Sequence, residues 1–147
     1  MRYADALHYA GAAHNDNPVL LSQSQGKPHC YNCGVVRLRI KRGNSLELTI
    51  ALKQRATPSS AFAAVDITGW VIAAQVRNPT TRALVAQLTS AIVDAPTGTF
   101  RLSALATATA TWPLAKLLGD IRYQRADGYV FSTEDFEVEV RQEVTAP

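Results

Sequence analysis

The feature that most constrains this chain is an alternation of apolar and polar residues that begins near residue 36. In VVRLRIKR, the apolar residues Val36, Leu38 and Ile40 alternate with basic residues, and LELTIALK again places apolar residues at every second position. Successive side chains of a β-strand point to opposite faces, so this alternation predicts strands with one buried and one solvated face. The chain therefore has to fold mainly as sheet.

Further alternating runs follow, each ended by residues that favour turns. The runs are GWVIAAQVRN, LVAQLTSAIV, TFRLSAL, IRYQRA and FEVEVRQEV, and the turn signals include Asn78-Pro79, Asp94–Gly98 and Asp127-Gly128. Residues 104–117 are rich in alanine and threonine, which predicts a short helical turn or an irregular crossing. We expect an all-β sandwich of about seven antiparallel strands over residues 35–147.

Residues 1–34 lack this periodicity and are rich in Gly, Pro, Asn, Gln and Ser. We interpret them as an extended N-terminal arm that precedes the sandwich. Tyr3 and Tyr9 lie on it, and aromatic side chains on such a segment serve as anchors when it docks on a partner. The alternative is that both tyrosines belong to a disordered arm.

Both cysteines of the chain lie in PHCYNCG, within the same arm. The C-x-x-C spacing of Cys30 and Cys33 suits a metal knuckle, in which one turn presents two thiolates to an ion. The further ligands would be the adjacent His29, or His8 and His14 upstream, or a second cysteine pair from a symmetry-related arm. Such a pair serves zinc or an iron–sulfur cluster.

Two other hypotheses for this motif stay open. Cys30 and Cys33 can form a local disulfide or remain free thiols. A redox function needs C-x-x-C at the start of a helix near a βαβ unit, and the sequence pattern predicts neither.

Composition argues against several classes of function. The net charge of +3 is small and dispersed, so we expect no nucleic-acid partner. No run approaches the roughly 20 apolar residues of a membrane span, and the start of the chain lacks a secretory signal. The predicted sandwich contains no histidine to serve as a general base, and no phosphate-binding glycine loop is present. We therefore expect a non-enzymatic protein with no membrane association.

Two charged stripes mark the first and the last predicted strands. Arg37, Arg39 and Lys41 share the outward face of the first, and Glu137 and Glu139 share that of the last. If the two strands are neighbours, we expect cross-strand ion pairs that also protect a sheet edge. If they are not, the stripes would be complementary docking surfaces on adjacent subunits. Either way, Arg37, Arg39 and Lys41 are candidate interaction residues.

The turn motifs occur in a particular order. They are R-G-N-S at 42–45, V-D-I-T-G-W at 65–70, D-A-P-T-G-T-F at 94–100 and I-R-Y-Q-R-A-D-G at 121–128, before an acidic final strand. Over residues 36–145 this order resembles the immunoglobulin-like domains of bacteriophage tail and baseplate proteins, such as the N-terminal domain of siphophage baseplate upper proteins. The resemblance implies an immunoglobulin-like sandwich and a virion part that joins tail or baseplate to fibres or other proteins.

The resemblance to this family implies a phage structural protein that acts as an adaptor or connector in the tail or baseplate. Its partners would be fibres or neighbouring tail proteins, with homo-oligomeric contacts within the assembly. We expect synthesis in the bacterial host cytoplasm and a final location in the virion tail. The alternatives are a small metal-binding or redox module carried on a β-sandwich, and a capsid decoration or head–tail protein.

Overall fold

The computed structural model describes residues 6–9, 20–21, 37–54, 61–133 and 135–145. These residues form a sheet of 11 strands and one short helix, so the predicted all-β fold is confirmed. The elements are β1 (Ala6–Tyr9), β2 (Leu20–Leu21), β3 (Arg37–Lys41), β4 (Leu46–Gln54), β5 (Ala63–Ala64), β6 (Val71–Arg77), β7 (Leu84–Asp94), β8 (Thr99–Ala104), α1 (Ala106–Thr109), β9 (Lys116–Gln124), β10 (Val130–Ser132) and β11 (Phe136–Arg141).

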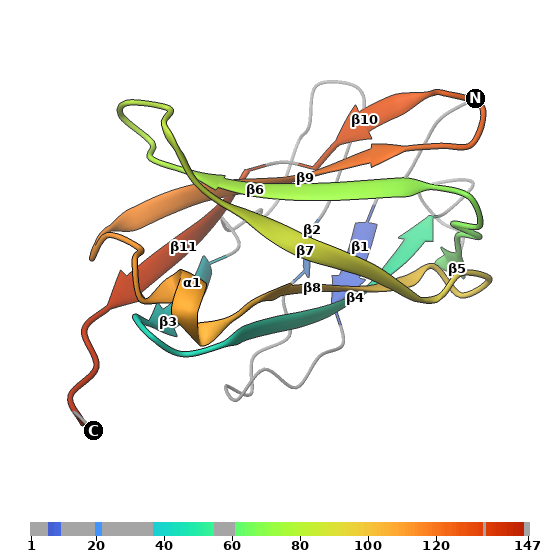
Figure 1. Ribbon diagram of the computed structural model, residues 1–147. Coiled ribbons are helices and arrows are strands. Elements are labelled where there is room, and N and C mark those ends of the chain that lie inside the picture. The colour runs from blue at the N-terminus through green and yellow to red at the C-terminus, as the bar shows by residue number, and fades with distance from the viewer. Residues whose placement is uncertain (1–5, 10–19, 22–36, 55–60, 134, 146–147) are drawn as a thin grey trace.

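The strands follow one hydrogen-bonded path, β2-β1-β4-β8-β7-β6-β9-β11-β3, with β5 on β4 and β10 on β9. The long strand β7 belongs to two parts of this path, because its residues up to Leu88 pair with β6 and its residues from Thr89 pair with β8. Figure 1 shows β7 crossing between the two groups of strands. The sheet therefore curls so that its two groups of strands face each other, and it stays continuous through β7.

The pairing of β3 with β11 departs from the expected antiparallel arrangement. These two strands run parallel, with Leu38 opposite Val138 and Ile40 opposite Val140. The chain leaves β3 through a tight turn and enters β4 in the other layer, so β3 does not pair with the strand that follows it. It lies beside the last strand instead, where Ile40 joins the core.

Two of the turn motifs show why they end strands. In V-D-I-T-G-W, Asp66 Oδ1 accepts hydrogen bonds from the Thr68 hydroxyl at 2.6 Å and the Thr68 N–H at 2.8 Å. In D-A-P-T-G-T-F, Gly98 adopts a φ of 71°, and a Cβ there would lie 2.5 Å from the Val65 carbonyl oxygen and 2.7 Å from that of Leu52. Only glycine fits this close approach of three backbone segments.

The core lies between the two layers. Its largest fully buried side chains are Trp112, Tyr123, Phe100 and Phe136. Phe100 of β8 meets Tyr123 of β9 edge to face, with ring centroids 5.8 Å apart, so the two layers are in direct contact. The Tyr123 hydroxyl has no hydrogen-bond partner among the described residues, and burial raises its pKa well above 10.0. Within this part of the chain a polar group thus lies in an aromatic core without a partner.

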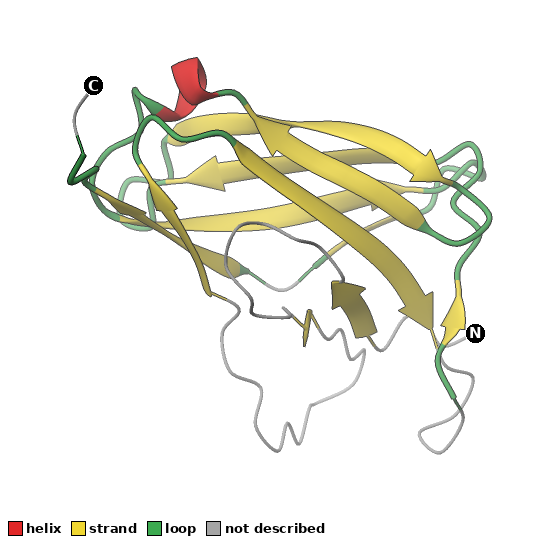
Figure 2. Ribbon diagram, turned by 90° about the horizontal axis from the view of Figure 1, so that it is seen from below, coloured by secondary structure: helices red, strands yellow, loops and turns green. Residues whose placement is uncertain are grey.

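The predicted arm contributes strands to one layer. β1 pairs antiparallel with β4, placing Leu7 opposite Leu52 and Tyr9 opposite Ile50, and β2 pairs with β1. The other residues of 1–34 lie outside the described part of the chain. The short helix α1, which follows β8, lies to the left in both views and is coloured red in Figure 2 (Figures 1 and 2).

Candidate functional site

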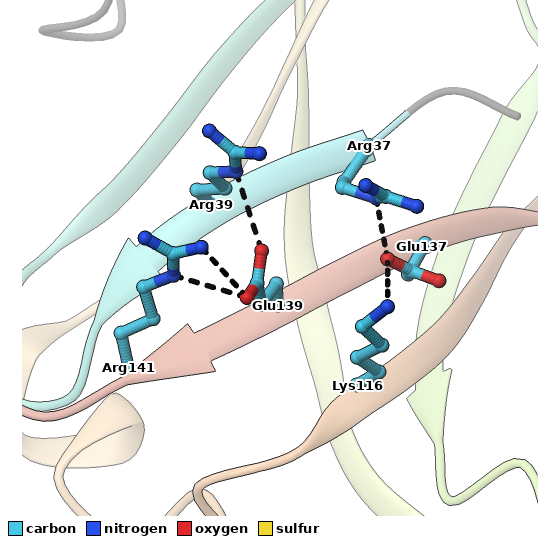
Figure 3. Close-up of polar contacts among 6 residues, drawn as sticks. All are labelled: Arg37, Arg39, Lys116, Glu137, Glu139 and Arg141. Carbon is cyan, nitrogen blue, oxygen red and sulfur yellow. Dashed lines mark hydrogen bonds and ion pairs between the residues drawn. The ribbon is translucent and has the colours of Figure 1, made fainter. Parts of the chain in front are cut away.

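A row of charged side chains lines the outer face of β3, β11 and the start of β9. The parallel register sets Arg37 opposite Glu137 and Arg39 opposite Glu139, while β9 brings Lys116 opposite Glu139. Residues directly opposite one another on adjacent strands share a face of the sheet. We call this set the charged ladder (Figure 3); its members are Arg37, Arg39, Lys116, Glu137, Glu139 and Arg141.

Two cations hold Glu137. Arg37 Nε lies 2.6 Å from Glu137 Oε1, and Lys116 Nζ lies 3.8 Å from the same oxygen. This oxygen is buried and receives no aligned hydrogen bond from the described residues, so both contacts act mainly through charge. Glu137 therefore bridges β3 to β9 across β11.

Glu139 is held by two arginines, each on a different oxygen. Arg39 Nε donates to Oε2 at 3.2 Å, and Arg141 donates to Oε1 through Nε at 3.0 Å and Nη2 at 2.9 Å. The hydrogen bonds from Arg141 lower the pKa of Glu139, helped by the charges of Arg141 and Arg39 and opposed by partial burial. The carboxylate is accordingly ionised at neutral pH.

The ladder presents its cations rather than its carboxylates to solvent. The side chains of Glu137 and Glu139 are 17% and 19% exposed, whereas those of Arg37 and Arg39 are 45% and 56% exposed. Two carboxylates are also fewer than the surrounding cations, which are Arg37, Arg39, Lys116 and Arg141. Exposed guanidinium groups with fixed stems suit the binding of carboxylate or carbonyl oxygens.

The predicted contact between the two charged stripes is confirmed. Besides the pairs on Glu137 and Glu139, Lys41 Nζ lies 3.6 Å from Glu143 Oε1. The first and last predicted strands are neighbours, so the condition for two separate docking stripes is not met.

The alternation along the last strand predicts Arg141 on the same outward face as Glu137 and Glu139, and the structure places it there. The member of the ladder that the sequence did not indicate is Lys116. Lys116 belongs to β9, which begins inside the stretch predicted as a helical turn or irregular crossing. Lys116 lies opposite Glu139 because β9 pairs with β11 in the register that sets Gly119 opposite Phe136. No local sequence pattern specifies this register.

The predicted metal ligands fall in the arm. Those that lie outside the described residues are Cys30, Cys33, His29 and His14, together with the predicted anchor Tyr3. His8 and Tyr9 belong to β1, where only the backbone is described. Within the described ranges, His, Cys, Asp and Glu residues form no group of three or more that could hold a metal ion. The zinc or iron–sulfur site thus stays a prediction.

Compared with the models of known protein families and with curated proteins, the chain matches none. In the part of the chain that the structure describes, no helix has the length and apolar character to cross a membrane. The functional argument therefore starts from the charged ladder and the fold that carries it.

Proposed function

We propose that this chain is a non-enzymatic structural protein of a phage virion, an adaptor in the tail or baseplate that connects fibres or neighbouring tail proteins. The charged ladder is the observation that carries the proposal. It lies at the last strand of the sheet path and presents half-exposed arginines over sheltered glutamates. Arginine is enriched in protein interfaces because its planar fork binds oxygen atoms in a fixed geometry.

The fold supports this proposal by its rigidity. The two layers share one core and are also joined through β7, so the sheet edges keep a fixed separation. Contact surfaces carried on strands are held more firmly than those on long loops. The turn motifs behind the resemblance to phage tail and baseplate domains close these strands, as at Asp66 and Gly98. In the proposed assembly the chain is homo-oligomeric and resides in the virion tail.

The test is to locate the protein in particles of the phage that encodes it. Antibody labelling followed by electron microscopy should mark the tail or its tip, and disruption of the gene should yield particles that lack fibres or baseplate parts. Labelling of the capsid would favour the capsid decoration alternative, and virions without the protein would reject a structural role.

A charge reversal adds a test of the ladder itself. Arg39→Glu should reduce incorporation into particles, because it places a third carboxylate beside Glu137 and Glu139. The matched control is Arg101→Glu on β8 in the other layer, where the native side chain is 46% exposed. Equal incorporation of both variants would show that the ladder makes no contact in the virion.

A further inference from the structure

We propose that the free edge of β3 binds an extended segment of a partner protein in which acidic and apolar residues alternate, added as a new strand beside β3. This inference names the partner chemistry of the proposed adaptor and rests on that function. Three features carry it: the open backbone edge, the unused donors of the arginines, and the apolar rim beneath them.

The edge of β3 is open within the described residues. β3 ends the strand path, with β11 on one side and no described strand on the other. An exposed row of backbone N–H and C=O groups is a template for pairing with another extended chain. Among the described strands none pairs with the side of β3 away from β11, and this is where we place the added strand.

Two hydrogen bonds fix which backbone groups point away. Arg42 N–H donates to the Arg141 carbonyl of β11 at 2.8 Å, whereas the Lys41 carbonyl turns away and accepts from Asn44 N–H at 3.1 Å. Backbone groups alternate in direction along a strand. The N–H and C=O groups of residues 37 and 39 consequently point toward the open edge.

The same residues carry unused donors. Arg37 and Arg39 each contact a glutamate of β11 through Nε alone, and in the described part of the chain their Nη groups have no recorded partner. A carboxylate on an added strand, directly opposite either arginine, would share its face and reach these Nη groups from the side away from β11. The partner strand should thus place Asp or Glu at every second position.

The inner face of β3 favours apolar residues at the intervening positions of the added strand. Ile40 is buried in the core and Leu38 is partly buried against it, so Leu38 forms the rim of the core at this edge. The intervening residues of an added strand would point to this inner side and cover the rim. Apolar side chains there remove further surface from water. An acidic–apolar alternation matches both faces at once.

A second copy of the same edge is a poor occupant. Pairing two β3 strands edge to edge would set the basic stripe Arg37, Arg39 and Lys41 against its own copy. Like charges directly opposite one another destabilise a strand pair. The charges therefore disfavour pairing of two β3 edges and favour pairing with an acidic strand. The same edge thus binds a specific partner without promoting aggregation.

Peptide binding to the purified full-length chain tests the proposal. The probe is a fluorescein-labelled peptide of alternating Glu and Val, titrated at low salt and followed by fluorescence anisotropy. Its matched control is a peptide of alternating Lys and Val. We expect saturable binding of the Glu-Val peptide alone, weakened by added salt because exposed charges take part.

Two variants at one position separate charge from backbone. Arg39→Ala removes the guanidinium but keeps the outward N–H, and we expect about tenfold weaker binding. Arg39→Pro also removes the N–H, and we expect no measurable binding; proline is tolerated where that group faces solvent at a sheet edge. Arg101→Ala in the other layer should bind as the unchanged protein does. Circular dichroism melts confirm that each variant is folded.

Failure of the Glu-Val peptide to saturate, equal binding of both peptides, or unchanged binding by Arg39→Ala would overturn the inference. If Arg39→Pro fails to fold, Arg37→Ala replaces it, with a loss similar to that of Arg39→Ala expected. The particle-labelling result is independent of these titrations. A labelled tail without peptide binding keeps the adaptor and rejects this edge, whereas binding without a labelled tail rejects the virion location alone.

Discussion

The inner and outer faces of β11 differ sharply although they belong to one six-residue strand. On the inner face Phe136, Val138 and Val140 are at most 4% exposed, whereas Glu137 and Glu139 on the outer face belong to the charged ladder. The inner face is held by close packing of apolar side chains, and the outer face by ion pairs. Changes on the two faces should therefore have separate effects, the inner ones on folding and the outer ones on contacts.

The largest expected effect comes from a cavity on the inner face of the neighbouring strand β9. Leu117→Ala should lower the free energy of unfolding by roughly 2–5 kcal/mol, because Leu117 is 0% exposed and its loss leaves a cavity. Leu118→Ala is the matched control on the outer, half-buried face, where we expect a loss below about 1 kcal/mol. Urea denaturation measures both. Equal losses would abolish the distinction between the faces.

Overpacking the inner face should have the next largest effect. Gly119 lies opposite Phe136, and a Cβ there would come within 2.5 Å of Phe136 Cε2. Gly119→Ala should therefore displace the ring and lower the free energy of unfolding by roughly 1–3 kcal/mol. Asp120→Ala, one residue along on the outer face, is the control in the same urea series. Unchanged stability of Gly119→Ala would mean that the ring moves aside freely.

One inner-face change should raise stability. Tyr123→Phe removes a fully buried hydroxyl for which the described part of the chain offers no hydrogen-bond partner, and we expect a gain of about 1 kcal/mol at neutral pH. Burial raises the pKa of Tyr123 in the folded state. As the pH rises above the ordinary phenol pKa of 10.0, the unfolded chain ionises at Tyr123 first, so the free energy of unfolding of the wild type falls until the pH reaches the folded-state pKa. In thermal melts, the melting temperature of Tyr123→Phe should exceed that of the wild type at neutral and at alkaline pH, and the difference should be larger at alkaline pH. A less stable variant would reveal a partner for the hydroxyl.

The smallest effect is expected on the outer face. Glu139→Gln removes a carboxylate whose pKa is lowered, so its stabilisation is present above the ordinary carboxyl pKa and is lost as the pH falls through the folded value. The melting temperatures of variant and wild type should differ slightly at neutral pH and converge in acid. Glu47→Gln, whose carboxylate lies 3.7 Å from Arg101 in the other layer, is the control. A difference that persists in acid would assign Glu139 a role other than charge.

The sequence predicted this division between faces because the direction of a side chain is a local property of a strand. Alternation placed Val138 inward and Glu139 outward, and the turn motifs marked where the chain reverses. It also predicted the pairs on Glu137 and Glu139, given neighbouring strands.

What local patterns left open depends on contacts between distant segments. The parallel pairing of β3 with β11, the passage of β7 through both layers and the place of Lys116 all follow from register and connection. Register arises from the packing of whole strands rather than from any one of them. The arm residues Cys30 and Cys33 lie outside the described part of the chain, so their predicted site stands as it did from the sequence.

The parallel pairing of β3 and β11 has a mechanical consequence. The chain enters β3 at one end of the pair and leaves β11 at the other, so tension between the segments before and after this pair pulls the two strands in opposite directions along their length. Such a load is shared by the whole row of backbone bonds and by the ion pairs beside them, whereas a pull across a hairpin breaks its bonds one at a time. The molecule should therefore resist stretching most strongly along the length of β3 and β11.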